Sequence, residues 1–590
     1  MITLQNFLAP EPGICTEQSL YHREQGVVGF SYDSGAYVIP RSSRLSFKTY
    51  FNIFNLDSWR DCALDGLFLE LNGTGEVELQ VTHSPTGRSD EVVHRTVVTL
   101  QPDTPYVVDL SRFHGAGGVL SLSLTAIGDQ VRLHAARFAT QSPPDTLPDL
   151  TVSITTFKRE AEVQETVARL QAFLQSFPLA DHIRVQVVDN GQSAEISKSD
   201  HVTPYPNRNL GGAGGFARGL LEAEAAGASH CLFMDDDASF HMENIARTYM
   251  MLAFARDPKT AVAGAMINTT NKWAIWESGA WFDGACRPLW GGTNLRSSAQ
   301  MMRMQHAVND PKPATLYGGW WFFAFPIAAV KHYPFPFFVR GDDISFSIAN
   351  DFHIQTLNGV VSFQDDFTEK ESAQTLYLDL RNHIHHHLVF DSLSRSPLGT
   401  AKVPLRFILR SLLRMHYSTA EVQLMAWRDV MSGPEFFDKN IDMSARRGDI
   451  KELAADEAWQ PIETQPQERR FRNIGRLPRS WRTRLGLLTL NGHLIPFWSR
   501  IGSRITLEIK HRGLVYHALG ASQVTFVNTN RDKAYTRNHD KRRFFRIVKE
   551  AISLTREFCR NYDAIKAAHR KGYAEMASKS YWEKTLDTSE

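Results

Sequence analysis

The chain has 590 residues, and its 65 lysines and arginines nearly balance its 64 aspartates and glutamates. This length predicts several domains, and the balanced charge excludes a global attraction to nucleic acid. Five scattered cysteines without CxxC spacing exclude a disulfide framework and favour a reducing compartment. The first residues lack a signal-peptide pattern, and the longest apolar run, residues 317–330, is shorter than the ~20 residues that span a bilayer. We therefore expect a cytoplasmic protein without a membrane-spanning helix.

Short apolar runs with a period of two fill the first part of the chain. VELQV at residues 77–81, LSLSL at 120–124 and VRLHA at 131–135 each place their apolar side chains on one face. This alternation is typical of antiparallel strands that pack in a sandwich. We predict a jelly-roll-like β-sandwich domain over residues 1–140, followed by a linker, QSPPDTLPD, at residues 141–149.

From residue 150 continuous apolar runs alternate with helical segments, which is typical of a mostly parallel sheet covered by helices. We predict a Rossmann-like α/β domain over residues 150–395. Its ligand should bind beyond the carboxyl ends of the strands, where TTFKRE, VVDNG and FMDDD lie. Residues 396–590 predict a mainly helical domain, with a possible strand pair in LGLLTLNGHLIPFW at residues 485–498.

Three consecutive aspartates follow the apolar run in CLFMDDDASF, residues 231–240. Crowded carboxylates repel each other unless a cation compensates them. Because residues i and i+2 of a strand point the same way, Asp235 and Asp237 can share one cation while Asp236 faces another neighbour. Hard divalent ions accept such oxygens together with those of a diphosphate. The alternative is a solvated acidic turn or a helix N-cap.

A glycine-rich stretch, NRNLGGAGGFARGL at residues 207–220, precedes these aspartates. Glycines before a helix let the backbone approach an anion and direct helix N-terminal amides at it. The spacing is neither that of a Walker A loop nor that of the dinucleotide fingerprint. On its own, the stretch also fits a flexible turn or a helix cap.

Six motifs, taken in chain order, resemble those of one enzyme family. TTFKR, VVDNG, NLGGAGGF, FMDDD, YGGWWFFAFP and GDDISF are similar to motifs of inverting GT-A glycosyltransferases, and more narrowly of the polymerising galactofuranosyltransferases that build mycobacterial galactan. FNIFNLDSWR and YSTAEVQLMAWRDVMSGPEFF resemble the family's β-sandwich and helical domains. The resemblance implies transfer of galactofuranose from UDP-galactofuranose to a lipid-linked, galactofuranose-containing glycan, with Mn²⁺ or Mg²⁺ as cofactor and a homo-oligomer, a tetramer in the family.

The resemblance also implies a role for individual residues. An inverting transfer needs one base, which takes the proton of the acceptor hydroxyl as that oxygen attacks the anomeric carbon. The alternative for the two tryptophans is core packing, and for Asp342 it is a helix N-cap. The implied roles are catalytic base for Asp343; donor binding for Arg159, Asn190, Asn209, Asp235 and Tyr317; acceptor binding for Trp320, Trp321, Asp342 and Phe367; and metal binding for Asp237 and Gln364.

The sequence departs from the family pattern at two places. Gln364 stands where the family has a metal-binding histidine, and its carbonyl is a weaker ligand than imidazole, so Asp365 is an alternative ligand. The family's acceptor-binding glutamate falls on Ala280, with Glu277 a helical turn earlier.

Two further segments each allow two interpretations. HIHHHL, residues 383–388, places His383 and His387 on one helix face, as a metal site would, but such histidines also occur as surface or packing residues. ERRFRNIGRLPRSWRTRLG, residues 468–486, carries seven arginines between apolar residues. It fits either a solvated face or a patch that holds the protein to an anionic membrane on the inner face of the plasma membrane.

Two other functions compete with the family's activity. The chain can be a related transferase that uses another UDP-sugar in O-antigen or capsule synthesis. It can also be a carbohydrate-binding protein whose α/β domain is inactive, although the presence of Asp235, Asp237 and Asp343 argues against this.

Overall fold

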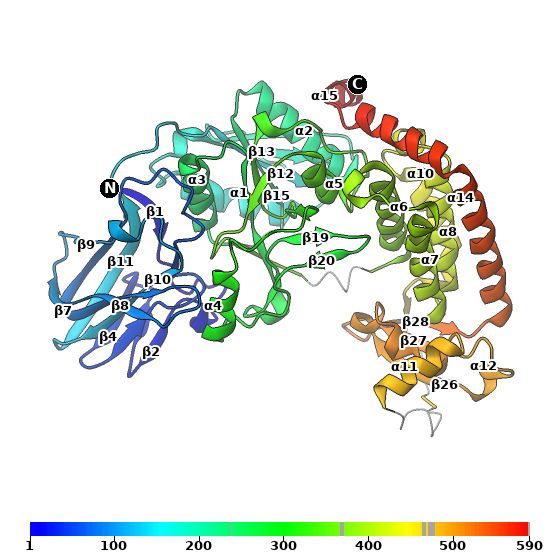
Figure 1. Cartoon of the computed structure of the whole chain (residues 1–590), viewed down its shortest axis with the longest axis horizontal. Helices are drawn as coiled ribbons and strands as arrows, with labels where there is room; N and C mark the ends of the chain where they lie inside the picture. Colours follow the sequence, from blue (N-terminus) through cyan, green and yellow to red (C-terminus); the bar gives the residue numbers. More distant parts are fainter. Residues whose placement is uncertain (238, 366–370, 463–467, 470–477, 588–590) are drawn as a thin grey trace.

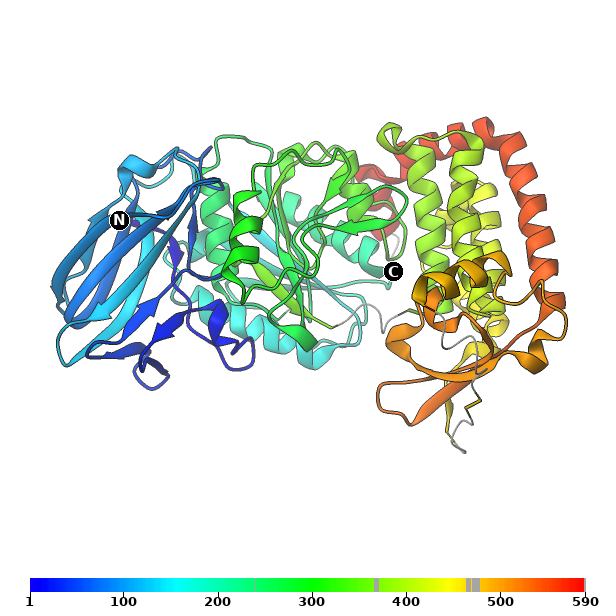
Figure 2. The same ribbon diagram turned by 60° about the horizontal axis from the view of Figure 1, so that its bottom comes forward.

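The computed structural model describes residues 1–237, 239–365, 371–462, 468–469 and 478–587. These residues form a β-sandwich, an α/β region and a mainly helical region that lie in a row (Figures 1 and 2). The predicted fold class is confirmed. The predicted domain boundaries stay a prediction, because one hydrophobic core runs through the sandwich and the α/β region.

The sandwich consists of two sheets that share one long strand, β7 (Phe68–Ser84). Its first half pairs with β11 (Gln130–Thr140), and its second half pairs with β8 (Glu91–Leu100) and β10 (Val119–Ala126). The position where β7 passes from one sheet to the other needs a glycine. At Gly75 φ is +102°, and a Cβ there would lie 2.4 Å from a backbone oxygen. The remaining strands are β1 (Ile2–Asn6), β2 (Arg23–Gln25), β3 (Gly29–Ser31), β4 (Ala36–Pro40), β5 (Arg44–Ser46), β6 (Phe54–Asn55) and β9 (Tyr106–Asp109).

The central sheet of the α/β region has the strand order β14-β13-β12-β15-β22-β16-β23. The first four strands are parallel, as predicted, whereas β22 runs antiparallel to both of its neighbours. In β15 the four residues before Asp235 are fully buried, which explains their continuous apolar run. The strands are β12 (Leu150–Thr156), β13 (Ile183–Asp189), β14 (Val202–Pro206), β15 (His230–Asp235), β16 (Thr260–Ala263), β22 (Phe323–Pro326) and β23 (His353–Gln355).

Helices and two small sheets surround this central sheet. One small sheet has the order β18-β17-β24, and the other β20-β19-β21. The helices are α1 (Glu160–Leu174), α2 (Gly211–Ala225), α3 (Glu243–Phe254), α4 (Ser298–His306) and α5 (Asp342–Ala349); the strands are β17 (Ala265–Asn268), β18 (Ile275–Glu277), β19 (Ala280–Phe282), β20 (Cys286–Pro288), β21 (Leu316–Tyr317) and β24 (Val361–Gln364).

A buried arginine of α3 joins the sandwich to the α/β region. The guanidinium of Arg247 donates hydrogen bonds to the carbonyl oxygens of Asn6 (2.7 Å), Phe51 (3.0 Å) and Asn358 (3.0 Å). Its charge is paired with Glu243 on the same helix. A buried guanidinium is tolerated only when its donors are satisfied. These bonds therefore fix the sandwich against the sheet.

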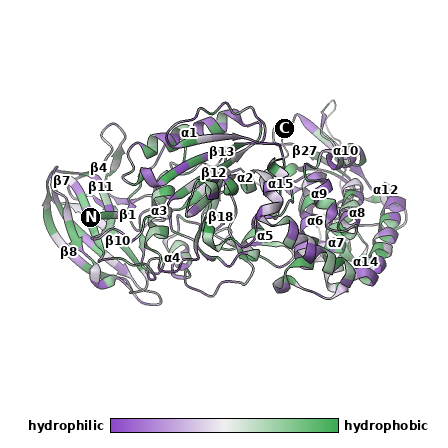
Figure 3. Cartoon of the chain, turned by 90° about the horizontal axis from the view of Figure 1, so that it is seen from above, coloured by the Kyte–Doolittle hydropathy of each residue, from purple (hydrophilic) through white to green (hydrophobic). Residues whose placement is uncertain are grey.

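The C-terminal region is built on a helical bundle. Its longest helix, α14 (Lys541–Met576), follows the bundle with alternating apolar and polar residues (Figure 3). The buried side chains recur at steps of three and four residues, as in an amphipathic helix: Phe544, Ile547, Ala551, Leu554, Phe558, Tyr562, Ile565 and His569. The other helices are α6 (Ala373–Val389), α7 (Pro397–Leu413), α8 (Tyr417–Met431), α9 (Glu435–Lys439), α10 (Ser444–Leu453) and α15 (Lys579–Asp587).

The predicted strand pair at residues 485–498 is wrong. That segment contains the end of α11 (Arg479–Leu488) and the start of α12 (Trp498–Ile501). A sheet of order β25-β28-β27-β26 is formed by other residues. Its elements are β25 (Gln460–Pro461), β26 (Ser503–Glu508), β27 (Ala521–Val527) and β28 (Lys533–Asn538), with α13 (Val515–Ala518) between two of them.

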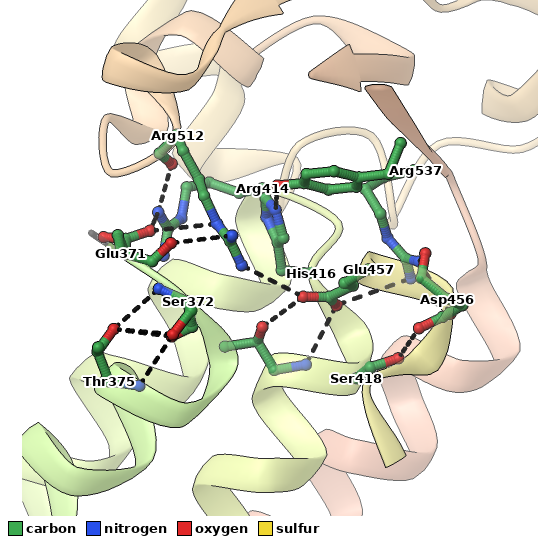
Figure 4. A network of polar contacts seen from close by, with 12 residues as sticks. Glu371, Ser372, Thr375, Arg414, His416, Ser418, Asp456, Glu457, Arg512 and Arg537 are labelled. Carbon is green, nitrogen blue, oxygen red and sulfur yellow. Dashed lines mark hydrogen bonds and ion pairs between the residues drawn. The ribbon is translucent and has the colours of Figure 1, made fainter. Parts of the chain in front are cut away.

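A buried ionic network ties this sheet to the helices (Figure 4). Arg414 at the end of α7 pairs with Glu371 (2.8 Å), just before α6. Arg512 lies between Glu371 and Glu457, at 3.6 Å from each carboxylate. Arg537 of β28 binds Asp456 at 2.8 Å. Because each buried charge has an opposite partner, the network fixes the start of α6 relative to the small sheet.

Within the described part of the chain, no helix combines the length and the apolar character that crossing a bilayer requires.

Candidate active site

A cavity of about 310 Å³ opens at the carboxyl edge of the central sheet. The register places Asp189 opposite Thr156 and Asp235 opposite Thr155, so the ends of three strands meet there. The cavity contains four of the five predicted donor-binding residues, Arg159, Asn190, Asn209 and Asp235. It also contains Phe157, Phe338, Val339 and Arg447, which the sequence analysis did not single out.

Two of these donor-binding candidates hold the glycine-rich turn at the start of α2. The amide of Asn190 donates to the carbonyl of Gly211 (3.0 Å), and the side-chain oxygen of Asn209 accepts from the amide of Gly211 (3.1 Å). At Gly211 φ is +70°, and a Cβ there would lie 2.0 Å from the carbonyl oxygen of Phe338. The glycine thus allows a close approach to the backbone of Phe338, whereas the predicted approach to an anion stays a prediction.

The three aspartates each have a different environment. The strand ends at Asp235, so the expectation that Asp235 and Asp237 alternate with Asp236 along one strand does not hold. Asp236 is buried and accepts from the hydroxyl of Thr156 (2.5 Å), and burial raises its pKa to about 6. Asp237 pairs with Arg159 at 2.6 Å. Arg159 therefore compensates the crowded carboxylates.

The predicted metal ligands can be tested for fit. Gln364, at the end of β24, lies beside Asp235, with its amide nitrogen 3.3 Å from a carboxylate oxygen. Together with Asp237 these side chains supply hard oxygens of the kind that Mg²⁺ and Mn²⁺ bind. The described residues contain no cluster of three histidine, cysteine, aspartate or glutamate ligands. A cation at these oxygens would therefore need diphosphate oxygens to complete its coordination, and the metal-binding roles of Asp237 and Gln364 stay predictions. Asp365, the alternative ligand, accepts a hydrogen bond from the hydroxyl of Thr269 (3.1 Å).

The adjacent carboxylates Asp342 and Asp343 begin α5, and Asp342 reaches the cavity. A Cβ at Gly212 would lie 3.4 Å from a carboxylate oxygen of Asp342. Burial raises the pKa of both groups, and the charges of Asp343 and Asp235 raise that of Asp342 further. The N-cap alternative for Asp342 is wrong, because the N-cap is Gly341 and no side chain caps this helix.

The loop before Asp342 and Asp343, residues 338–341, has a strained backbone that is held by hydrogen bonds. Phe338, Arg340 and Gly341 all have φ between 73° and 79°, which L side chains rarely adopt. The buried Asn382 of α6 donates to the carbonyls of Val339 (3.2 Å) and Arg340 (2.5 Å). These bonds hold the loop in its strained form and thereby position Asp342 and Asp343.

Tyr317 lies near Asp343, the predicted base. Burial raises its pKa, and Cys286, Glu277 and Asp343 add to the shift, so these groups are neighbours. Glu277 is buried on strand β18 and not on a helix; burial and the charge of Asp343 raise its pKa to about 8. Ala280 follows on β19. The structure thus brings Glu277, rather than Ala280, to the predicted base.

The remaining predicted acceptor residues lie in different surroundings. Trp320 is buried in a core cluster, where its ring contacts those of Phe216, Phe233 and Phe346. Trp321 packs against another core, and its indole nitrogen donates to the carbonyl of Gly264 (2.9 Å). Phe367 lies outside the described residues. The acceptor-binding role of these residues stays a prediction.

The histidines of α6 pack in the protein core. His383, His386 and His387 surround the ring of Phe282, and burial lowers the pKa of each. His385 packs on Phe335. Because all four side chains are buried against aromatic rings, the structure supports the packing interpretation.

Comparisons with known proteins agree with this arrangement. The family model "Galactofuranosyltransferase 2 N-terminal" matches residues 4–141. The chain is 27% identical over 432 residues to the galactofuranosyltransferase GlfT2 of Mycolicibacterium smegmatis, covering 67% of this chain and 65% of the relative. It is 26% identical over 440 residues to GlfT2 of Mycobacterium tuberculosis, covering 67% and 66%. The chain is thus similar to galactofuranosyltransferases, and the matches span slightly less than two thirds of the length of these two relatives.

Some solved structures resemble parts of this chain, with low TM-scores. The mannosyltransferase PcManGT from Pyrobaculum calidifontis, in complex with GDP-Man and Mn²⁺, is 16% identical and matches 48% of this chain and 76% of its own, with a TM-score of 0.28. At this score the likeness carries no argument about the function of this chain.

Proposed function

We propose that the protein is an inverting glycosyltransferase that transfers galactofuranose from UDP-galactofuranose to a galactofuranose-containing glycan. A lipid-free oligosaccharide is the simplest acceptor for a test. The observation that carries the proposal is the cavity at the sheet edge. It gathers Arg159, Asn190, Asn209 and Asp235, and the carboxylate of Asp342 reaches its wall. The similarity to proteins named galactofuranosyltransferase supports galactofuranose as the transferred sugar.

The chemistry follows from the charges of the site. Asp343, the base that the family pattern implies, accepts the proton of the acceptor hydroxyl. Burial and the charges of Asp343 and Asp235 raise the pKa of Asp342, which can donate a hydrogen bond to the acceptor when it is protonated. Arg159 stabilises the negative charge that develops on departing UDP. A divalent cation held by Asp235, Asp237 and the carbonyl of Gln364 would neutralise the same diphosphate when bound.

The first test is UDP release in the presence of a synthetic galactofuranosyl acceptor. UDP-galactofuranose and UDP-galactopyranose are compared, each with Mn²⁺ or with EDTA. We expect turnover with the furanose and Mn²⁺ only. If only another UDP-sugar were turned over, that sugar nucleotide would be the donor instead of UDP-galactofuranose. UDP binding without turnover on any acceptor would favour a carbohydrate-binding role.

The proposed metal-binding role of Asp237 predicts how UDP affinity depends on Mn²⁺. In Asp237→Ala the closer ion pair of Arg159 is lost and only Asp236, at 3.5 Å, remains, so more of that guanidinium can bind phosphate. We therefore expect UDP to bind the variant in EDTA at least as tightly as it binds the unmodified protein. Addition of Mn²⁺ should tighten UDP binding to the unmodified protein and leave the variant unchanged. Calorimetric titration measures both, and an equal response to Mn²⁺ would remove Asp237 from the metal site.

We also propose that the region around α11 and α12 binds an anionic membrane, where a lipid-linked acceptor would be presented. Residues 470–477 of the arginine-rich segment lie outside the described residues, but its end forms α11, where Arg484 lies 5.9 Å from the ring centre of Trp481. Large apolar side chains are exposed on both helices and between them, and such a cluster marks an interaction surface. They are Trp481, Leu485, Leu487, Leu488, Leu494, Phe497 and Ile501. Apolar residues beside arginines are typical of interfacial helices.

Vesicle sedimentation tests this surface. Phe497→Glu should reduce binding to vesicles that contain phosphatidylglycerol, because it removes an inserted apolar group and repels the anionic lipid. The matched control is Val27→Glu on the sandwich, since Val27 and Phe497 are both 74% exposed. Equal loss in both variants, or binding that does not depend on salt and on anionic lipid, would contradict the proposal.

A further inference from the structure

One residue of the donor cavity comes from the C-terminal region. Arg447 of α10 lines the cavity together with Arg159, Asn190 and Asp235. Its place in the chain, more than two hundred residues after the aspartates, gave no reason to connect it with the donor.

The guanidinium of Arg447 is only weakly engaged within the protein. It donates one long hydrogen bond, 3.4 Å, to the carbonyl of Asp442, and it lies 5.4 Å from the ring centre of Phe338. Among the described residues it forms no ion pair. The preceding Arg446, by contrast, binds the carboxylates of Asp429 (2.8 Å) and Asp449 (2.6 Å). Arg447 therefore keeps hydrogen-bond donors for a ligand of the cavity.

Buried contacts fix the start of α10 against the cavity wall. The guanidinium of Arg381 on α6 donates to the sulfur of Met443 (3.1 Å) and to the carbonyl of Phe337 (2.5 Å). The backbone amide of Arg447 in turn donates to the carbonyl of Met443 (2.8 Å). Arg381 thus ties the helix that carries Arg447 to the loop that carries Phe338.

A diphosphate in the cavity needs positive charge beyond Arg159, even with the proposed divalent cation bound, because the three carboxylates of Asp235, Asp236 and Asp237 offset both. Arg159 already lies 2.6 Å from Asp237 and 3.5 Å from Asp236, so its charge is largely compensated. The carboxylate of Asp235 also faces the cavity and would repel a diphosphate. A guanidinium without a carboxylate partner suits this need, because it binds phosphate oxygens through charge-assisted hydrogen bonds.

We propose that Arg447 binds the diphosphate of the nucleotide-sugar, so that the C-terminal region completes the donor site. The inference rests on the proposed function, since it takes a UDP-sugar as the ligand of the cavity. It adds a binding residue from a part of the chain that the six motifs do not reach.

The test compares UDP with uridine, which lacks the phosphates, by calorimetric titration in excess Mn²⁺. We expect Arg447→Gln to weaken UDP binding about tenfold to a hundredfold and to leave uridine binding unchanged. Arg447→Lys should recover part of the loss, because it restores the charge without the planar fork. Lys451→Gln, an exposed position of the same helix, is the control and should bind UDP normally.

Each result has a defined meaning. If the unmodified protein binds UDP tightly and Arg447→Gln binds it equally well, this inference fails and the proposed function stands. Equal loss of UDP and uridine binding would also overturn it, because the arginine would then act on the nucleoside or on the fold; an unchanged melting temperature distinguishes these two. If the unmodified protein binds neither ligand, both proposals fail.

Discussion

Asp343→Asn is expected to lower the rate of glycosyl transfer by about a hundredfold to ten-thousandfold, the usual contribution of a general base. The amide keeps the size of the carboxylate and the hydrogen bond that Asp343 accepts from the amide of Ile344 (2.8 Å), but it cannot accept a proton. UDP affinity should stay unchanged, because the donor cavity lies around Arg159 and Asn190. Single-turnover transfer and UDP titration measure the two quantities separately.

The pH dependence of transfer and a control variant test the role of Asp343 further. Burial raises the pKa of Asp343, so the base becomes protonated, and transfer declines, at a higher pH than for a solvated aspartate. The acidic decline should disappear from the residual activity of Asp343→Asn. Asp351→Asn is the control, since Asp351 is exposed beyond α5 and binds Lys259. Near-normal turnover in Asp343→Asn would remove Asp343 as the base.

Much of the donor side could be predicted from the sequence, because its residues follow strands. An apolar run that ends in polar residues marks the carboxyl edge of a parallel sheet, and three such runs brought Arg159, Asn190 and Asp235 into one cavity. Phe338 and Arg447 could not be found in this way. They reach the cavity through a strained loop and through the packing of α10 on α6, and neither feature leaves a periodic pattern in the sequence.

The wrong strand prediction has a physical cause in the same region. Asn-Gly between apolar runs is a strong signal for a hairpin turn. Here Leu490, Asn491 and Gly492 all have positive φ, but they end helix α11 rather than join two strands. The left-handed conformation that a hairpin turn requires also terminates helices, so the dipeptide alone cannot distinguish the two.

Gly211→Ala is expected to destabilise the fold and weaken donor binding together. A φ of +70° costs an L residue about 1–2 kcal/mol, and the new Cβ would meet the carbonyl oxygen of Phe338 at 2.0 Å. That oxygen accepts the hydrogen bond of the Ala213 amide (3.1 Å), so relief of the clash must separate the glycine-rich turn from the loop before the acid pair. Urea unfolding should therefore show a loss of more than about 2 kcal/mol, and UDP titration a weaker complex.

Gly212→Ala is the matched control for this prediction. The neighbouring glycine has no positive φ, and a Cβ there would lie 3.4 Å from the nearest atom, an oxygen of Asp342, which is ordinary contact. Because alanine is also the better helix former by about 0.5–1 kcal/mol, stability should stay level or rise slightly. If both substitutions changed the unfolding free energy equally, the loss would reflect the general intolerance of the turn. A difference confined to Gly211 would show that the contact with Phe338 joins the donor side of the site to the base.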